Sequence, residues 1–288
     1  MRKLIVAISK LKYLGLLGLP MIVSDMHIWK YFWLFWLFGV LEIMFIFPVF
    51  IQSLQQAAGL IYIALKYKEL PDPDYYQPQV LYSLPFEAEW TVVNGGVYKE
   101  DSHSWAIATQ RYAYDFIILD LQGRSFAGSE AACADYYCYE KNILSPADGV
   151  VVEVKNSCRD SQVMGGGQTD PLIKDIRGNY VVIQHSSNEY SCLTHLKLNS
   201  ILVEVGQTVK RKQPIARCGN TGNSSEPHLH FQVQNGKSFF TSAGLPIHFQ
   251  NIQAALQPEY SLYDKRTINL ERKERPNFIS RGQRVRND

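Results

Sequence analysis

The segment from Asn220 to Val233 constrains the chain most, because it ends in two histidines separated by one residue. It reads NTGNSSEPHLHFQV, a loop of small polar residues followed by alternating apolar and polar residues. Such alternation predicts a β-strand on which residues i and i+2 point to the same side. His228 and His230 should therefore lie roughly 7 Å apart at their backbones. Two imidazoles so placed can share a small site as metal ligands or general bases, although a solvated strand face can carry the same pattern.

Short apolar segments bounded by turn residues precede these histidines and predict a mainly antiparallel β domain. They read SPADGVVVEV (145–154), GNYVVIQH (178–185), THL (194–196) and VGQTVKRKQPIARCGNTGNS (205–224). Long helical periodicity is missing from this part of the sequence, and turn-punctuated short strands are typical of antiparallel sheets. We expect the His-x-His strand and the strand around Asp115 to share a groove.

The order of these segments, closing with PHLHFQV, resembles the lysostaphin-like, LytM-type zinc metallopeptidase family over about residues 110 to 235. The resemblance implies an antiparallel β-sheet groove, a bound zinc ion and hydrolysis of peptide bonds in bacterial peptidoglycan. By the same resemblance, Asp115 and His230 are zinc ligands. His195 and His228 are the two catalytic histidines, which act on the attacking water and stabilise the tetrahedral intermediate.

One metal ligand of that family is missing from its usual place. The histidine of the family's His-x-x-x-Asp motif falls at Arg111, and a guanidinium in a protein stays protonated and cannot bind a cation. The first hypothesis is that His103, eight residues upstream, is brought back by a loop and completes a zinc site with Asp115 and His230.

The second hypothesis is that the site has degenerated. Arg111 and Asp115 would then pair, and the domain would be a non-catalytic module that binds peptidoglycan or activates another wall hydrolase. Retention of His195, His228 and His230 favours the catalytic hypothesis, because each would be free to change in a dead site.

The N-terminal part of the chain predicts a membrane anchor. Residues 31–51 read YFWLFWLFGVLEIMFIFPVFI, and a helix of that length spans roughly 30 Å, the thickness of a bilayer core. Lysines and arginines before this run favour a cytoplasmic N-terminus, so one span places the catalytic region outside the cytoplasm. The expected organisation is a basic, interfacial segment (1–30), a transmembrane helix (31–51), an interfacial stretch with a proline-containing linker (52–85), the peptidase domain (86–250) and a solvated basic tail (251–288).

Other classes of protein fit the sequence less well. SPADGVVVEV and VGQTVKRKQPI also resemble biotinyl and lipoyl carrier domains, but the required hairpin lysine is missing and the histidines are left unexplained. A phosphate loop and an aromatic-basic pattern for nucleic acid are missing too. The family resemblance implies peptidoglycan as a partner, and the apolar residues 31–51 imply the membrane. A local disulfide between Cys133 and Cys138 is sterically possible, and the lack of a second closely spaced cysteine pair excludes a zinc ribbon.

Overall fold

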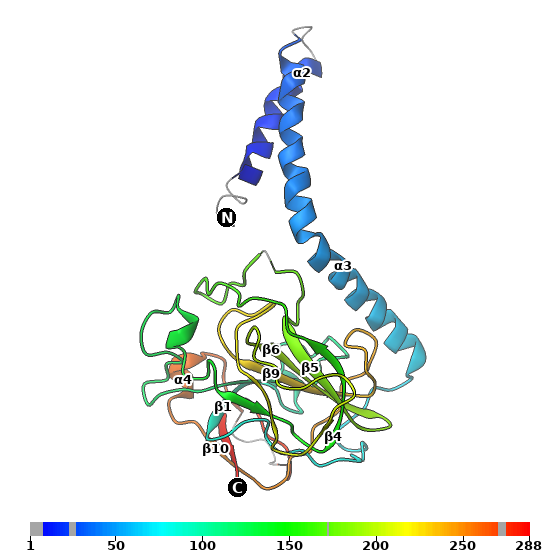
Figure 1. The fold of residues 1–288 in the computed structure, drawn as a ribbon, viewed down its shortest axis with the longest axis vertical. Coiled ribbons are helices and arrows are strands. Elements are labelled where there is room, and N and C mark those ends of the chain that lie inside the picture. The colour runs from blue at the N-terminus through cyan, green and yellow to red at the C-terminus, as the bar shows by residue number, and fades with distance from the viewer. Residues whose placement is uncertain (1–7, 23–26, 172, 270–274) are drawn as a thin grey trace.

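The computed structural model describes residues 8–22, 27–171, 173–269 and 275–288, which form a helical rod and a β domain (Figure 1). Arg2 and Lys3, which contribute to the expected membrane orientation, lie outside the described residues. The rod projects from one side of the β domain, and the longest helix connects the two parts (Figure 1).

The rod is a helical hairpin. The 3-10 helix η1 (Lys10–Ile22) runs back along α2 (Trp29–Phe32), η2 (Trp33–Trp36) and the start of α3 (Leu37–Lys66). Glycine is required in this packing, because a Cβ on Gly18 would lie 2.6 Å from the indole of Trp33. The same indole donates a hydrogen bond of 3.2 Å to the Gly18 carbonyl.

Helix α3 extends beyond the transmembrane segment that the sequence predicts. It passes through Pro48 and continues to Lys66, so the first part of the expected interfacial stretch is helical. Alanine and leucine favour helix after Pro48, and the chain becomes extended only at Tyr67. Within the described residues, Phe47–Lys66 is the one segment long and apolar enough to cross a membrane.

The β domain is built on a nine-stranded sheet with antiparallel neighbours, which confirms the predicted fold class. The strands, in the order β10-β11-β1-β2-β9-β6-β5-β4-β7 across the sheet, are β10 (Ile252–Leu256), β11 (Gln283–Asn287), β1 (Trp90–Asn94), β2 (Tyr114–Ile117), β9 (Leu229–Gln234), β6 (Glu189–Leu196), β5 (Asn179–Ser186), β4 (Gly149–Lys155) and β7 (Thr208–Val209). A second, two-stranded sheet pairs β3 (Asn142–Leu144) with β8 (Pro214–Arg217). The short helices of the domain are η3 (Lys99–Asp101), η4 (Cys133–Asp135) and α4 (Tyr260–Tyr263).

The three central strands separate the core from the polar face of the sheet. Tyr114, Phe116, Leu229, Phe231 and Leu193 are fully buried in the main hydrophobic core. The residues between them in sequence point to the opposite face, because side chains alternate along a strand. Strand register then places Asp115 beside His230 and His230 beside Thr194.

The expected basic tail is instead part of the sheet. Strand β11 pairs with β1 on one side and β10 on the other, and Val285 is 0% exposed. Composition alone suggested a solvated segment, because residues 262–288 contain eight Lys or Arg and four Asp or Glu, including Arg284 and Arg286. These arginines flank an inward-facing valine, however, and this alternation is that of a half-buried strand.

The disulfide considered between Cys133 and Cys138 is not formed. In the described part of the chain all five cysteines are free thiols. Helix η4 turns the chain so that Cys138 is buried and donates a hydrogen bond of 3.1 Å to the Pro227 carbonyl. The Cys133 thiol contacts the Ser161 carbonyl instead, at 3.8 Å.

Replacing Val285 by alanine should lower the free energy of unfolding by about 2 kcal/mol, because it leaves a cavity between β1 and β10. The matched control is Leu256→Ala on β10, where the side chain is 50% exposed and the change should stay within about 0.5 kcal/mol. Urea denaturation followed by tryptophan fluorescence measures both. A negligible effect of both substitutions would mean that the C-terminal segment is solvated after all.

Candidate functional site

Asp115 lies at the centre of a cluster of histidines. Its carboxylate Oδ1 is 2.8 Å from Nδ1 of His230 and 3.8 Å from Nε2 of His228, and its Oδ2 is 3.7 Å from Nδ1 of His103. Asp115 is only 7% exposed. A buried carboxylate is costly unless it is paired, and here three imidazoles face it.

A chain of amides fixes the orientation of the His230 ring. Its Nε2 lies 3.0 Å from Oε1 of Gln232, whose Nε2 donates to Oε1 of Gln234 at 2.6 Å and to the Thr109 carbonyl at 3.3 Å. Because an amide oxygen can only accept, Nε2 of His230 carries the proton. Its Nδ1 is therefore the atom presented to Asp115.

His230 and Asp115 form an ion pair. Burial lowers the pKa of His230, but the hydrogen bond to Asp115 and the aspartate charge outweigh it and raise that pKa. For Asp115, burial raises the pKa, but the hydrogen bond and charge of His230 outweigh it and hold the pKa well below its usual value.

His195 and His228 are both held through Nδ1. Nδ1 of His195 donates to the Thr221 carbonyl at 2.7 Å, and Nδ1 of His228 donates to the Glu226 carbonyl at 2.8 Å. Each ring is thereby left with Nε2 as its unprotonated atom, and the ring centroids are 4.6 Å apart. His195 adopts a φ of 61°, a left-handed conformation that is uncommon outside glycine and often found at functional sites.

His195 and His230 differ from each other in protonation. Burial, followed by the charges of His228 and His230, lowers the pKa of His195 well below its ordinary value. His195 is therefore neutral under conditions in which His230 is charged. A neutral imidazole with a free Nε2 can accept a proton from a substrate or a water molecule.

His103 reaches the cluster from the loop after η3. Its backbone N–H donates to Oδ1 of Asn94 at 2.8 Å, which holds this loop against the end of β1. The His103 side chain is 58% exposed. The structure thus brings His103 beside Asp115, and its role as a zinc ligand stays a prediction.

Arg111 points to another partner. Its Nε donates to the Trp105 carbonyl at 3.3 Å, and its guanidinium lies over the Trp105 ring at 5.1 Å. In the described part of the chain, the ion pairs of Asp115 are with histidines. The Arg111–Asp115 pair expected of a degenerate site is not among these contacts.

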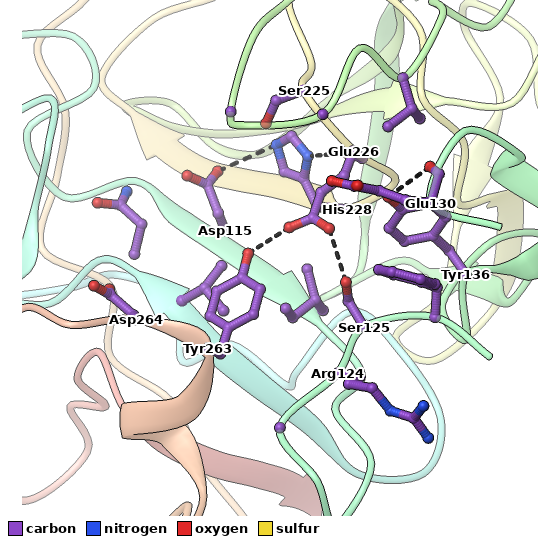
Figure 2. A pocket seen from close by; sticks show the side chains of 18 of the residues that line it. Asp115, Arg124, Ser125, Glu130, Tyr136, Ser225, Glu226, His228, Tyr263 and Asp264 are labelled. Carbon is purple, nitrogen blue, oxygen red and sulfur yellow. Dashed lines mark hydrogen bonds and ion pairs between the residues drawn. The ribbon is translucent and has the colours of Figure 1, made fainter. Parts of the chain in front are cut away.

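A cavity of about 590 Å³ opens beside His228 and contains residues that the sequence analysis did not identify. Figure 2 shows Glu226 in its wall, accepting hydrogen bonds from Ser125 at 2.8 Å and from Tyr263. Glu226 lies in the loop before the His-x-His strand, so its position in the sequence could have marked it as a candidate site residue. The sequence position of Tyr263 does not mark it in this way. Tyr263 belongs to α4, which lies in the sequence between β10 and β11, and its place beside the cavity depends on long-range strand pairing.

The carboxylate and imidazoles around Asp115 are of the types that bind zinc. Two ligand atoms of a tetrahedral zinc lie roughly 3.4 Å apart when each is about 2.1 Å from the metal. The separation of 3.7 Å between Asp115 and His103 is close to that value. The 2.8 Å contact of Asp115 with His230 is a hydrogen bond, and among the described residues no three His, Cys, Asp or Glu side chains have the spacing of a metal site.

Comparison with known proteins assigns the class of the domain. Residues 133–241 match peptidase family M23. The chain therefore carries a peptidase M23 domain, as the resemblance noted in its sequence implies. The matched residues include His195, His228 and His230, whereas His103 and Asp115 precede them.

Curated relatives agree with this assignment over short segments. The peptidoglycan DD-endopeptidase ShyA of Vibrio cholerae is 52% identical over 91 residues, 32% of this chain and 17% of that protein. ShyB of the same organism is 47% identical over 72 residues, 24% of this chain and 16% of that protein. An uncharacterized metalloprotease of Buchnera aphidicola is 37% identical over 91 residues, 32% of this chain and 19% of that protein. The alignments thus span less than a fifth of each relative.

Solved structures give weaker likenesses. A zinc-containing peptidase from Vibrio cholerae aligns with a TM-score of 0.35 and 23% identity, covering 58% of this chain and 40% of that one. The catalytic domain of lysostaphin from Staphylococcus simulans aligns with a TM-score of 0.30 and 20% identity, covering 57% and 86%. The assignment to the family rests on the sequence match.

After removal of metal by chelation, His195 and His230 should differ in protonation at pH 6.5, where an ordinary imidazole is half protonated. His195 should be neutral with its proton on Nδ1, because its pKa is lowered. His230 should be an imidazolium, because its pKa is raised. Nitrogen-15 chemical shifts of the rings, assigned with His195→Gln and His230→Gln, measure this. Equal half protonation of both rings at that pH would contradict the described geometry.

Proposed function

We propose that the chain is a zinc metalloendopeptidase that hydrolyses peptide bonds of bacterial peptidoglycan. The observation that carries the proposal is the buried carboxylate of Asp115 surrounded by imidazoles of His103, His228 and His230. The presence of an M23 domain, and the names of the Vibrio cholerae relatives, support peptidoglycan as the substrate.

His103, Asp115 and His230 would hold the metal through two imidazole nitrogens and a carboxylate oxygen. When bound, zinc supplies a Lewis acid and lowers the pKa of a water molecule toward 7. The amide of Gln232 keeps the proton on Nε2 of His230, so that Nδ1 is left as the ligand atom. A hydrogen bond on the far nitrogen orients many metal-binding histidines in this way.

His195 and His228 would move protons during peptide hydrolysis. Their Nδ1 atoms are committed to backbone carbonyls, which leaves Nε2 of each ring to accept a proton from the attacking water. The protonated ring can then donate to the developing oxyanion or to the leaving amine. Because both rings are held in place before substrate binds, little reorganisation is needed.

The alternative is a non-catalytic module that binds peptidoglycan or activates another hydrolase. It requires Arg111 to take the place of the metal charge beside Asp115. The stacking of Arg111 on Trp105 supports the catalytic proposal, because it leaves the Asp115 carboxylate to the histidines.

The proposed location is the cell membrane, with a single span and the catalytic domain outside the cytoplasm. Large apolar side chains along α3, including Leu37 and Phe47, are more than half exposed, as expected for a surface that faces lipid. A peptidoglycan hydrolase needs access to the wall, which agrees with an extracytoplasmic domain.

The zinc content of the purified full-length protein should depend on His103 and His230. Wild type should carry one zinc per chain, and His103→Ala and His230→Ala should lose most of it. His228→Ala should keep zinc but lose roughly 10²–10⁴-fold in hydrolysis of peptidoglycan, the usual contribution of a positioned proton-transfer group. His27→Ala, an exposed histidine in the rod, is the matched control and should resemble wild type.

Two results would decide against parts of this proposal. Wild-type protein that takes up no zinc at micromolar concentration would favour the non-catalytic module. Full zinc binding in His103→Ala would remove His103 from the site while leaving the enzyme assignment intact.

Reporter fusions should locate the catalytic domain. Alkaline phosphatase fused after residue 90 should be active, because this enzyme forms its disulfides only in an oxidising compartment, whereas green fluorescent protein fused there and exported by the same route should stay dark. The same pair of reporters at the N-terminus should give the opposite pattern for a single span. A fluorescent cytoplasmic fusion after residue 90 would contradict the proposed location and the peptidoglycan substrate with it.

A further inference from the structure

The C-terminal half of α3 lies against the β domain rather than projecting from it (Figure 1). The amide of Gln52 makes two hydrogen bonds with the segment before β5, accepting from the Ile176 N–H at 2.8 Å and donating to the Lys174 carbonyl at 2.9 Å. One side chain thus satisfies two backbone groups of the catalytic domain.

Contacts continue along the same face of the helix. Gly59 approaches the Phe240 carbonyl so closely that a Cβ would lie 1.8 Å from its oxygen. Ile63 is 1% exposed and packs in a small apolar cluster with Ala108 and Ala243. The spacing of Gln52, Gly59 and Ile63 by seven and four residues places them on one face of a helix, so α3 is docked over roughly 16 Å of its length.

This docked face also borders the catalytic histidines. A second cavity, of about 510 Å³, has His195, His228 and His230 on one side. Val49, Ser53 and Gln56 of α3 lie on the other side. A space of this size is within the range that proteins use to bind small ligands.

We propose that α3 forms one wall of the peptide-binding cleft and that Gln56 positions the substrate. This inference rests on the proposed function, since it assigns the cavity to the peptide that is cleaved. An extended peptide lies between α3 and the histidines. The Gln56 amide then offers a donor and an acceptor to its main chain, as amide side chains do.

The docking also sets the distance between the active site and the bilayer. The part of α3 from Val49 onward borders the cavity or contacts the β domain and therefore lies outside the lipid, so the bilayer-crossing part precedes Val49. The apolar character of Leu60 and Ile63, which lengthens the hydropathy signal to Lys66, is explained by their packing on the β domain. The substrate peptides are accordingly those within a few helical turns of the membrane surface.

The test uses full-length protein carrying His228→Ala, so that a cross-linked peptide from peptidoglycan is bound without being cleaved. Gln56→Trp fills the cavity from the α3 side and should raise the Kd for this peptide at least tenfold. Ile61→Trp is the matched control, since this residue is 62% exposed and lies on the opposite face of the helix; its Kd should equal that of the parent. Zinc content and the urea midpoint should be the same in all three proteins.

An unchanged Kd in Gln56→Trp would overturn the proposal, as would a parent protein that binds no peptide. Failure of the proposed function is a separate result, namely wild-type protein without zinc or turnover. Hydrogen exchange measures the docking itself. The Ile176 amide should exchange faster in Gln52→Ala than in Gln55→Ala, and equal rates would show that α3 is not docked.

Discussion

The pairing of Asp115 with His230 across β2 and β9 is the interaction on which the candidate site depends. A carboxylate buried to this extent would be strongly destabilising without partners, and strand register supplies the first partner directly. The other imidazoles then reach the same carboxylate from separate loops. A one-residue shift in the pairing of β2 with β9 would turn Asp115 into the hydrophobic core, so the core packing of Tyr114 and Phe116 also secures the position of the charge.

The histidines of the candidate site differ in which ring nitrogen is held by a hydrogen bond. His230 has an amide oxygen on Nε2, which leaves Nδ1 toward Asp115. His195 and His228 have backbone carbonyls on Nδ1, which leaves Nε2 toward the cleft. In the proposed function, these environments would separate one ligand imidazole from two proton-transfer imidazoles, in the way that active sites commonly assign roles to chemically identical groups.

Local patterns predicted much of this arrangement. Strand alternation was sufficient to place His228 and His230 on one side, and turn-bounded segments were sufficient to predict an antiparallel sheet. Three features depended on long-range contacts and could not be predicted in this way. Tyr263 reaches the cavity because β11 inserts beside β1. Arg111 leaves Asp115 because Trp105 offers a carbonyl and an aromatic face. Helix α3 borders the cleft because Gly59 and Ile63 fit the β domain.

In the proposed site, zinc is held by a carboxylate oxygen of Asp115 and by one imidazole nitrogen each from His103 and His230. X-ray absorption at the zinc edge of the purified full-length protein tests it most directly, because the ligand types and distances are read from the metal itself. Zinc in this site should have nitrogen and oxygen neighbours at about 2.0–2.1 Å, and the spectrum should show the multiple scattering of two imidazoles. A shell of sulfur at about 2.3 Å, or a spectrum of hydrated zinc without imidazole scattering, would contradict it.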